Sequence, residues 1–191
     1  MLWPAGSLGV VALNYVAIGE RGFQKTPRGT MSAGAWGLLA PYFLGAWLNS
    51  RLRNAWRPKS GLVADGVSVG RSRGPLDGDR ASFAAVVDLS AELPFAVAKG
   101  QNYRSIPVLD LTVPSSVKLR EAVAAIEEAR THGPVLVCCA VGLSRSASAV
   151  VAWLVATGRA EDVDAAIRMV REARPSLVVY PGLRSALEEL I

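Results

Sequence analysis

The chain has 191 residues, of which 51% are hydrophobic, and a formal net charge of +5. Residues 1–60 hold seven Lys and Arg against one acid, whereas residues 61–191 hold 14 against 15. The nearly neutral larger part argues against nucleic acid as a partner, because nucleic-acid-binding domains carry a basic face. One histidine and two adjacent cysteines exclude a multi-histidine metal site, a zinc site of paired CxxC knuckles and a disulfide framework, so no metal or cofactor is expected.

Two apolar stretches without charge dominate the first 60 residues. They run from Leu2 to Ile18 and from Met31 to Ser50, and each approaches the roughly 20 residues that a helix needs to cross a bilayer. Basic residues follow the second stretch at once, so the positive-inside rule predicts that residues 61–191 are cytoplasmic. We interpret residues 1–60 as a membrane anchor, a hairpin of two transmembrane helices, followed by one domain over residues 61–191.

Three other interpretations of the apolar stretches stay open: a cleaved signal peptide, a pair of buried core helices, and helices lying in the membrane plane. The first stretch lacks the basic start that is typical of signal peptides, and export would expose the thiols of Cys138 and Cys139 to oxidation. The membrane hairpin is therefore the preferred interpretation.

After residue 60 the pattern alternates between strands and helices. A hairpin is predicted around the turn Asp65-Gly66, and buried strands are predicted at 83–89, 106–109 and 134–137. Helical spacing of apolar residues begins at 115, and further helices are expected at 145–156, at 161–173 and after 181. This alternation is typical of an α/β domain with a central, mainly parallel sheet flanked by helices, whose reactive loop lies at the carboxyl end of a strand.

The segment 135–147, VLVCCAVGLSRSA, joins a predicted strand to a predicted helix. In such a loop the backbone N–H groups converge and, with the helix dipole, form an anion site. Gly142 allows backbone geometry that a Cβ would obstruct, and Arg145 offers a planar fork for two phosphate oxygens. The same groups favour the thiolate of Cys139, a candidate nucleophile, while Ser146 can hydrogen-bond the sulfur and help it leave.

The predicted phosphate-binding residues are Ala140, Val141, Gly142, Leu143, Ser144 and Arg145. A plainer interpretation treats Cys138 and Cys139 as small buried apolar side chains on a strand. Neighbouring residues of a strand point to opposite faces, so burial on one face cannot account for both thiols. The catalytic interpretation is therefore preferred.

The run CAVGLSRS, residues 139–146, resembles the signature loop of the protein tyrosine phosphatases, and its flanks resemble the dual-specificity branch of that superfamily. The resemblance covers roughly residues 60–191. It implies the cysteine-phosphatase fold. It also implies that residues 103–115, YRSIPVLDLTVPS, are the acid loop and that Asp110 protonates the leaving oxygen.

Three further residues are interpreted from the same resemblance. Asp88 is the alternative acid but is expected to be structural, and Arg174, in the arginine-proline turn that follows the later helix, is also expected to be structural. The family usually has His before the nucleophile, where this chain has Cys138. That substitution bears on how strongly Cys139 is activated. Cys138 is expected to pack rather than to form a disulfide, because bonds between adjacent cysteines are strained.

The apolar N-terminal stretches resemble bacterial membrane-anchored members of the branch. This resemblance implies a location at the bacterial inner membrane, with the catalytic domain in the cytoplasm. The predicted activity is hydrolysis of phosphomonoesters through a thiophosphate on Cys139, without a metal.

Substrate preference is predicted from the loop. Apart from Arg145 its residues are uncharged, whereas inositide phosphatases commonly carry lysines there, so a phosphoprotein bearing phosphotyrosine or phosphoserine/threonine is preferred. The predicted anchor supports the alternative of a membrane lipid, such as phosphatidylglycerophosphate or a phosphoinositide. A non-catalytic pseudophosphatase and a sulfurtransferase are further alternatives, and both are disfavoured by the presence of Asp110 beside the cysteine motif.

Overall fold

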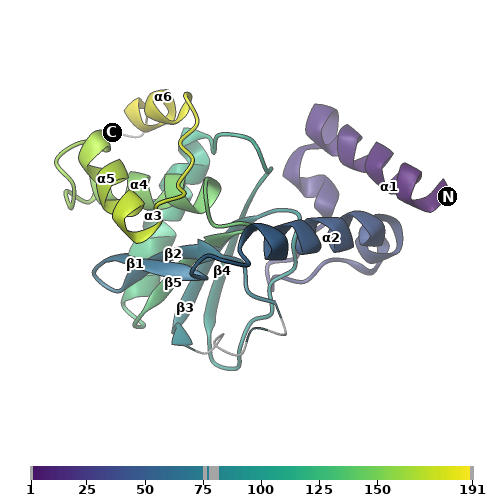
Figure 1. The fold of residues 1–191 in the computed structure, drawn as a ribbon, viewed down its shortest axis with the longest axis horizontal. Coiled ribbons are helices and arrows are strands. Elements are labelled where there is room, and N and C mark those ends of the chain that lie inside the picture. Colours follow the sequence, from purple (N-terminus) through teal and green to yellow (C-terminus); the bar gives the residue numbers. More distant parts are fainter. Residues whose placement is uncertain (1, 75–76, 78–81, 190–191) are drawn as a thin grey trace.

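A computed structural model of the chain describes residues 2–74, 77 and 82–189, and its centre is a five-stranded sheet (Figure 1). The strands are β1 (Ser60–Ala64), β2 (Val67–Arg71), β3 (Ala85–Ser90), β4 (Asn102–Val108) and β5 (Val135–Cys139), in the spatial order β1-β2-β5-β3-β4. Only β1 and β2 pair antiparallel, and the other neighbouring strands are parallel. The expected α/β fold is confirmed, with a mixed sheet.

The antiparallel part of the sheet is the hairpin that the sequence predicts. Its turn residues, Asp65 and Gly66, have φ values of 46° and 79°. Positive φ at both central residues is the geometry that matches the right-handed twist of the flanking strands. The hairpin lays β2 beside β5, so that Arg71 is the partner of Cys139 in the register.

Four helices cover the sheet domain. They are α3 (Ser116–Arg130), α4 (Arg145–Ala156), α5 (Val163–Ala173) and α6 (Leu183–Glu188). Alternate strand residues such as Val87 and Val137 share one core with α3 and α4, and Trp153 of α4 is fully buried there. The side chains of Val86 and Leu136 lie on the other face of the sheet, beside Phe95. Helix α4 is buried nearly all round, which explains its apolar composition.

The N-terminal region forms a second layer. It contains α1 (Leu2–Leu13), a π-helical turn (Asn14–Ile18), a 3-10 turn (Gly19–Phe23) and α2 (Ala33–Arg53). Near the start of α1, the Trp3 indole donates to the carbonyl of Gly37, near the start of α2, at 3.0 Å. The two helices therefore begin at the same end of the molecule and lie side by side (Figure 1). This arrangement differs from the predicted hairpin, in which they would run in opposite directions.

Among the described residues, one helical segment is long and apolar enough to cross a membrane, Leu2–Phe23, with 22 residues. Two membrane-spanning helices were expected, and one helical segment among the described residues meets the length and hydropathy that a span needs. Helix α2 is of similar length, but its last turns carry Asn49, Arg51 and Arg53. These residues, together with the glycines, tryptophans and Pro41 of α2, keep its mean hydropathy below what a membrane span needs.

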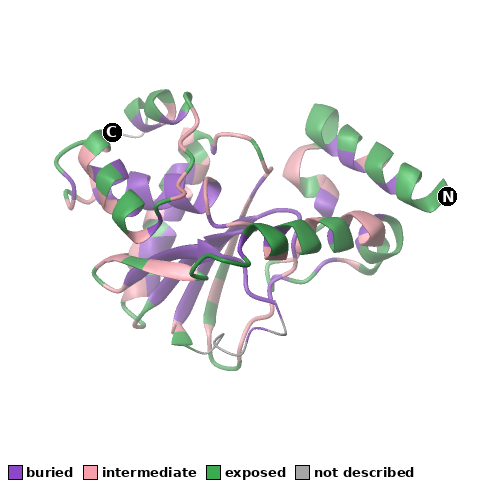
Figure 2. Ribbon diagram, viewed as in Figure 1, coloured by how far each residue is buried: buried purple, intermediate pink, exposed green. Residues whose placement is uncertain are grey.

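One side of α2 packs on the sheet domain and the other does not. Ala35, Leu39 and Phe43 are buried in a cluster that includes Phe23 and also Ala91, which follows β3. Other sides of α1, the π-helical turn and α2 are exposed (Figure 2). Large apolar side chains in these segments are exposed: Leu2, Trp3, Leu8, Leu13, Val16, Ile18, Trp36, Leu38, Leu44, Leu48 and Leu52. Contacts thus cross the boundary expected at residue 60.

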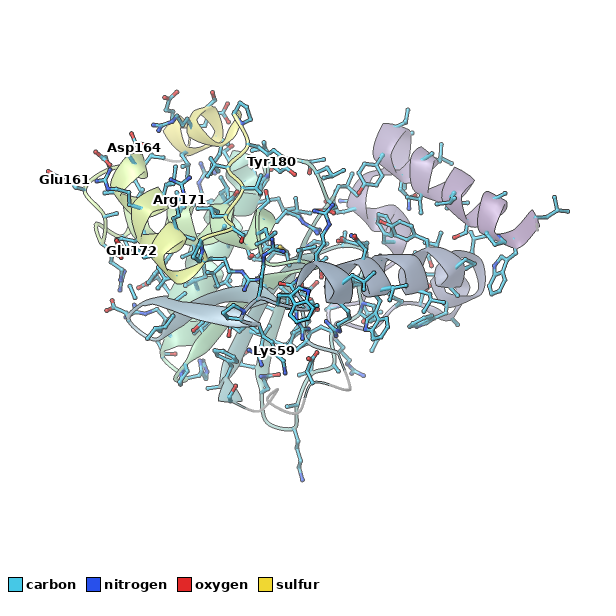
Figure 3. All side chains as sticks on the ribbon, viewed as in Figure 1. Lys59, Glu161, Asp164, Arg171, Glu172 and Tyr180 are labelled. Atoms are coloured by element: carbon cyan, nitrogen blue, oxygen red, sulfur yellow. The ribbon has the colours of Figure 1, made fainter. Side chains whose placement is uncertain are left out.

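The two ends of the molecule differ in character. Charged side chains in and before α5, including Glu161, Asp164, Arg171 and Glu172, lie at the end away from α1 (Figure 3). The exposed apolar side chains of α1 and α2 lie at the other end. The molecule is therefore polarised along its long axis.

Candidate active site

The β5–α4 loop (residues 139–145) lies at the carboxyl end of β5, as the sequence predicts. Its first residue, Cys139, ends the strand, and its last, Arg145, begins α4. Gly142 has a φ of 73°, and a Cβ built on it would lie 2.3 Å from the carbonyl carbon of Gly70. Both the conformation and the lack of space therefore require glycine at this position.

The Cys139 sulfur lies inside this loop. The side chain is buried, and its Sγ accepts a hydrogen bond from the Gly142 backbone N–H at 3.3 Å. The Ser146 hydroxyl lies 3.3 Å from the same sulfur. Because α4 also begins here, its dipole adds to these two contacts in favouring a negatively charged sulfur.

All carbonyl groups from Cys139 to Ser144 accept hydrogen bonds from outside the turn. Backbone N–H groups reach three of them: Ser72 to Cys139 at 2.7 Å, Val178 to Leu143 at 2.9 Å and Ser148 to Ser144 at 2.7 Å. Side chains of Ser50, Asn54 and Arg174 reach the carbonyls of Ala140, Val141 and Gly142. Since the O and N–H of a trans peptide point in opposite directions, the N–H groups are directed into the loop.

Arg145 is held by an acidic partner that the sequence did not indicate. Its Nη1 and Nη2 donate to the two carboxylate oxygens of Glu92 at 2.7 and 2.6 Å, and Nη1 also donates to the Val108 carbonyl at 2.8 Å. Burial lowers the pKa of Arg145, but the charge and hydrogen bonds of Glu92 outweigh it and raise the pKa well above its ordinary value. The guanidinium therefore stays charged although it is buried.

Two buried polar atoms of the loop have no hydrogen-bond partner among the described residues, Arg145 Nε and Ser144 Oγ. Buried polar groups nearly always have a hydrogen-bond partner, so two buried polar atoms without a partner in one loop indicate a ligand site. Both atoms belong to the predicted phosphate-binding residues. A phosphate group offers the oxygen acceptors that these donors lack.

Asp110 follows β4 and reaches the same site. Its Oδ1 lies 3.0 Å from Arg145 Nη2, and its side chain is 36% exposed. Asp88, the alternative acid, is fully buried, and its carboxylate binds Lys25 Nζ at 2.7 Å and the Tyr103 hydroxyl at 2.9 Å. Asp88 is thus a core ion-pair residue, while Asp110 lies where solvent and a substrate have access.

Cys138 lies on the opposite face of the sheet from Cys139. It packs with Val86, Phe95 and Leu136, and burial together with the nearby Asp88 raises the pKa of its thiol well above the usual value. Both cysteines are free thiols. Cys138 is therefore a packing residue in this structure.

A cavity of about 350 Å³ opens above the β5–α4 loop. One side is formed by Glu92, Asp110, Ala140 and Val141. The other side comes from α1 and α2, whose lining residues are Pro4, Leu8, Pro41, Tyr42, Gly45, Ala46 and Asn49. The N-terminal helices thus form a mainly apolar wall of the candidate active site.

A cysteine and an arginine at the two ends of a strand-to-helix loop, with a carboxylate beside the arginine, are consistent with a phosphatase of the cysteine-dependent class. The family described as dual specificity phosphatase, catalytic domain, matches residues 76–190, and the chain belongs to this family. No curated protein sequence matches the chain.

Solved structures agree with this assignment. Tk-PTP in its active form is 32% identical, with a TM-score of 0.62, and the match covers 71% of this chain and 97% of that one. Human DUSP28 is 30% identical, with a TM-score of 0.61 and coverage of 70% and 93%. PTPMT1 in complex with PI(5)P is 20% identical, with a TM-score of 0.61 and coverage of 70% and 94%, and shares the fold.

Sequence reasoning missed Glu92, Ser50 and Asn54. Glu92 had a usable signal, since it follows β3 at the sheet edge where the carboxyl ends of parallel strands gather. Ser50 and Asn54 had none, because they lie at the end of a stretch whose composition indicates a membrane helix.

Proposed function

We propose that this protein is a cysteine-dependent phosphomonoester hydrolase whose substrate is a membrane lipid with a single terminal phosphomonoester. The observation that carries the proposal is the cavity above the β5–α4 loop, because apolar residues of α1 and α2 form its wall opposite Asp110. The phosphate would bind at the loop, and the rest of the bound lipid would lie along that wall.

The first step begins when the phosphate oxygens bind the inward N–H groups of the loop and the free Nε of Arg145. Phosphate would compete with Asp110 for Arg145 Nη2, 3.0 Å from the carboxylate. The released Asp110 carboxylate then takes up a proton from solvent and faces the leaving oxygen. The Cys139 thiolate attacks phosphorus, the bond to the leaving oxygen breaks, and Asp110 gives that oxygen its proton.

The second step hydrolyses the thiophosphate. Asp110, now ionised, takes a proton from a water molecule that attacks phosphorus, and the sulfur leaves as a thiolate. Ser146 lies 3.3 Å from Sγ and is placed to donate a hydrogen bond to it as negative charge returns. Phosphate is then released and the starting state is restored.

Three observations favour a lipid over a phosphoprotein. Exposed apolar side chains cover the outer sides of α1 and α2, and Leu2–Phe23 is long and apolar enough to enter a membrane. The cavity wall beside the loop belongs to these same helices. PTPMT1, solved with PI(5)P, shares the fold.

The charge of the cavity narrows the lipid class. Its lining contains no Lys or Arg among the described residues, and Arg145 below it is the cation of the loop. A headgroup with several phosphomonoesters would lack counter-charges there. Phosphatidylglycerophosphate and phosphatidate therefore fit better than a polyphosphoinositide. The uncharged loop alone favours a phosphoprotein, and the apolar wall reverses that preference.

The proposal is tested with the full chain in mixed detergent micelles that contain a chelator. Phosphatidylglycerophosphate, phosphatidate, a phosphotyrosine peptide and a phosphoserine peptide are compared by phosphate release. We expect kcat/KM for one of the two lipids to exceed that for either peptide by about 10-fold or more. A peptide that is turned over better than both lipids would overturn the lipid assignment. Turnover that the chelator abolishes would overturn the cysteine mechanism.

A further inference from the structure

The β5–α4 loop receives two of its hydrogen bonds from the N-terminal region. Ser50 Oγ, near the end of α2, donates to the Ala140 carbonyl at 2.5 Å. Asn54 Nδ2, at the C-cap of α2, donates to the Val141 carbonyl at 3.3 Å. Both side chains are buried, with 0% and 6% of their surface exposed. Because α2 ends beside the sheet (Figure 1), these short side chains reach the loop.

These bonds act on two particular peptide units. The carbonyl of Ala140 belongs to the same planar unit as the N–H of Val141, and the carbonyl of Val141 to that of Gly142. An acceptor held outward therefore points the N–H of its own unit inward. The Gly142 N–H is the group that donates to Cys139 Sγ at 3.3 Å. The orientation of a donor to the sulfur thus depends partly on Asn54, the C-cap residue of α2.

Asn54 also joins the loop to the end of α5. Its Oδ1 accepts from Arg174 Nη2 at 2.7 Å, while its Nδ2 donates to the Ser50 carbonyl at 2.9 Å. Arg174 itself donates to the carbonyls of Val141 at 3.1 Å and Gly142 at 3.0 Å. The amide of Asn54 has both a donor and an acceptor role here, which neither Asp nor Ala can reproduce.

We propose that Ser50 and Asn54 are positioning residues of the active site, so that the end of α2 helps to hold the phosphate-binding loop in its conformation. Their role follows from the hydrogen bonds to Ala140 and Val141 and rests on the proposed phosphatase function. Both residues precede the segment 76–190 that the dual specificity phosphatase family matches. The family domain therefore does not supply these two bonds, and α2 does.

Removal of the Ser50 donor frees the Ala140–Val141 peptide unit to rotate. Removal of the Asn54 donor leaves the Val141 carbonyl with Arg174 Nη2 alone, at 3.1 Å, and removes the acceptor that holds this Arg174 nitrogen, so the Val141–Gly142 unit is held less firmly. A rotated unit would direct a carbonyl oxygen, instead of an N–H group, toward the sulfur and the phosphate. Electrostatic stabilisation of both anions would fall, because preorganised donors act on charge only when they keep their direction. The effect is expected on phosphate binding and on the reactivity of Cys139, beyond any effect on folding.

The test uses the full chain with Ser50→Ala and Asn54→Asp, each in a Cys138→Ser background in which Cys139 is the one remaining thiol. Asn54→Asp keeps the size of the side chain and an acceptor for Arg174, but loses the donor to Val141. Arg53→Ala is the matched control, because Arg53 is an exposed neighbour on α2 whose side chain hydrogen-bonds the exposed Asn49.

Three experiments are made. The first measures kcat and KM for p-nitrophenyl phosphate, the second the pH profile of Cys139 alkylation by iodoacetamide, and the third how far inorganic phosphate protects Cys139 from this alkylation. We expect Ser50→Ala and Asn54→Asp to lower kcat/KM by about 10-fold or more. The alkylation midpoint should move to higher pH, and more phosphate should be needed for protection. Arg53→Ala should match the unchanged background in all three.

Alkylation and phosphate protection separate this proposal from the proposed function. If no substrate is turned over but phosphate still protects Cys139, the enzyme assignment fails and the role of Ser50 and Asn54 is still tested by the shifts. The positioning role would be overturned if both variants kept the alkylation profile and the phosphate protection of the Cys138→Ser background, even if their turnover fell. The two variants disturb different peptide units. If one variant is destabilised, the other variant, provided that it keeps the Tm of the background, decides the test.

Discussion

The sheet domain and the N-terminal helix pair contribute to the site in different ways. The sheet domain supplies the proposed reacting groups, Cys139, Arg145 and Asp110, on a loop and beyond a strand end that its own core supports. The helix pair supplies the apolar wall of the cavity and two hydrogen bonds to the β5–α4 loop. A segment with the composition of an anchor can therefore also be part of a catalytic site.

The largest expected effect is on the chemistry of the sheet domain alone. Cys139→Ser should lower kcat by about 10³-fold or more, because serine is a far weaker nucleophile without a general base beside it. Cys138→Ser is the matched control, since that thiol lies on the opposite face of the sheet. Phosphate release from p-nitrophenyl phosphate measures both. Equal losses in the two variants would mean that the nucleophile is misassigned.

Asp110→Asn should lower kcat by about 10²-fold or more on substrates whose leaving alcohol has a high pKa, because proton donation by a general acid contributes on this scale. For p-nitrophenyl phosphate, whose leaving group is stable as an anion, the loss should be much smaller. The ratio of the two rates in each variant is the measurement. A uniform loss on both substrates would assign Asp110 to binding instead.

Glu92→Gln should lower kcat/KM by about 10- to 100-fold. Glu92 holds Arg145 through two charge-assisted bonds of 2.7 and 2.6 Å, and the amide would leave the buried guanidinium with the partly exposed Asp110 as its remaining counter-charge among the described residues. Kinetics with p-nitrophenyl phosphate and a thermal melt check the loss of activity and of stability together. Undiminished phosphate affinity in this variant would show that Arg145 does not depend on Glu92 for its position.

Gly45→Leu tests the helix pair without touching the reacting groups. Gly45 lines the cavity and has no heavy atom within 4 Å of its ideal Cβ, so leucine would project into open space. We expect KM for phosphatidylglycerophosphate to rise about 10-fold and KM for p-nitrophenyl phosphate to change less. Gly9→Leu is the control, since Gly9 is equally open but does not line the cavity. Identical effects of the two variants on the lipid would contradict the proposed wall.

The smallest effect concerns an ion pair that ties the two regions together. Asp77 binds Arg71 of β2 at 2.7 Å and Arg51 of α2 at 3.0 Å. Burial raises the pKa of Asp77, but hydrogen bonds from Arg71 and Gly74 and the nearby positive charges lower it well below its usual value. A carboxyl with a lowered pKa stabilises the fold above the unfolded pKa of about 4 and loses that contribution as the pH falls further.

Asp77→Asn should therefore lower Tm by about 2–4 °C at pH 7, and the difference from the unchanged chain should shrink below about pH 4. Thermal melts at a series of pH values measure it. A difference that stays constant down to low pH would mean that Asp77 acts through packing and not through its charge.

Local patterns in the sequence predicted most of the sheet domain. The Asp65-Gly66 turn, a buried strand at 134–137 and a helix from Arg145 to Ala156 were predicted and are present, with the strand running on to Cys139, because turn chemistry and apolar periodicity act over a few residues. The apolar composition of the first 60 residues also predicted two helices there, but it did not predict that the two helices run in the same direction. Apolar stretches of similar composition can pack in the same or in opposite directions.

By itself, the sequence determined the candidate reactive loop, because the proposed nucleophile Cys139, Gly142 and Arg145 are close neighbours whose spacing predicts their geometry. Glu92, Ser50 and Asn54 depend on contacts across 53, 90 and 87 positions of the chain. No periodicity reports such distances, since packing of separate elements decides which side chains meet. Only the tertiary structure placed the end of α2 against the loop and its apolar side along the cavity.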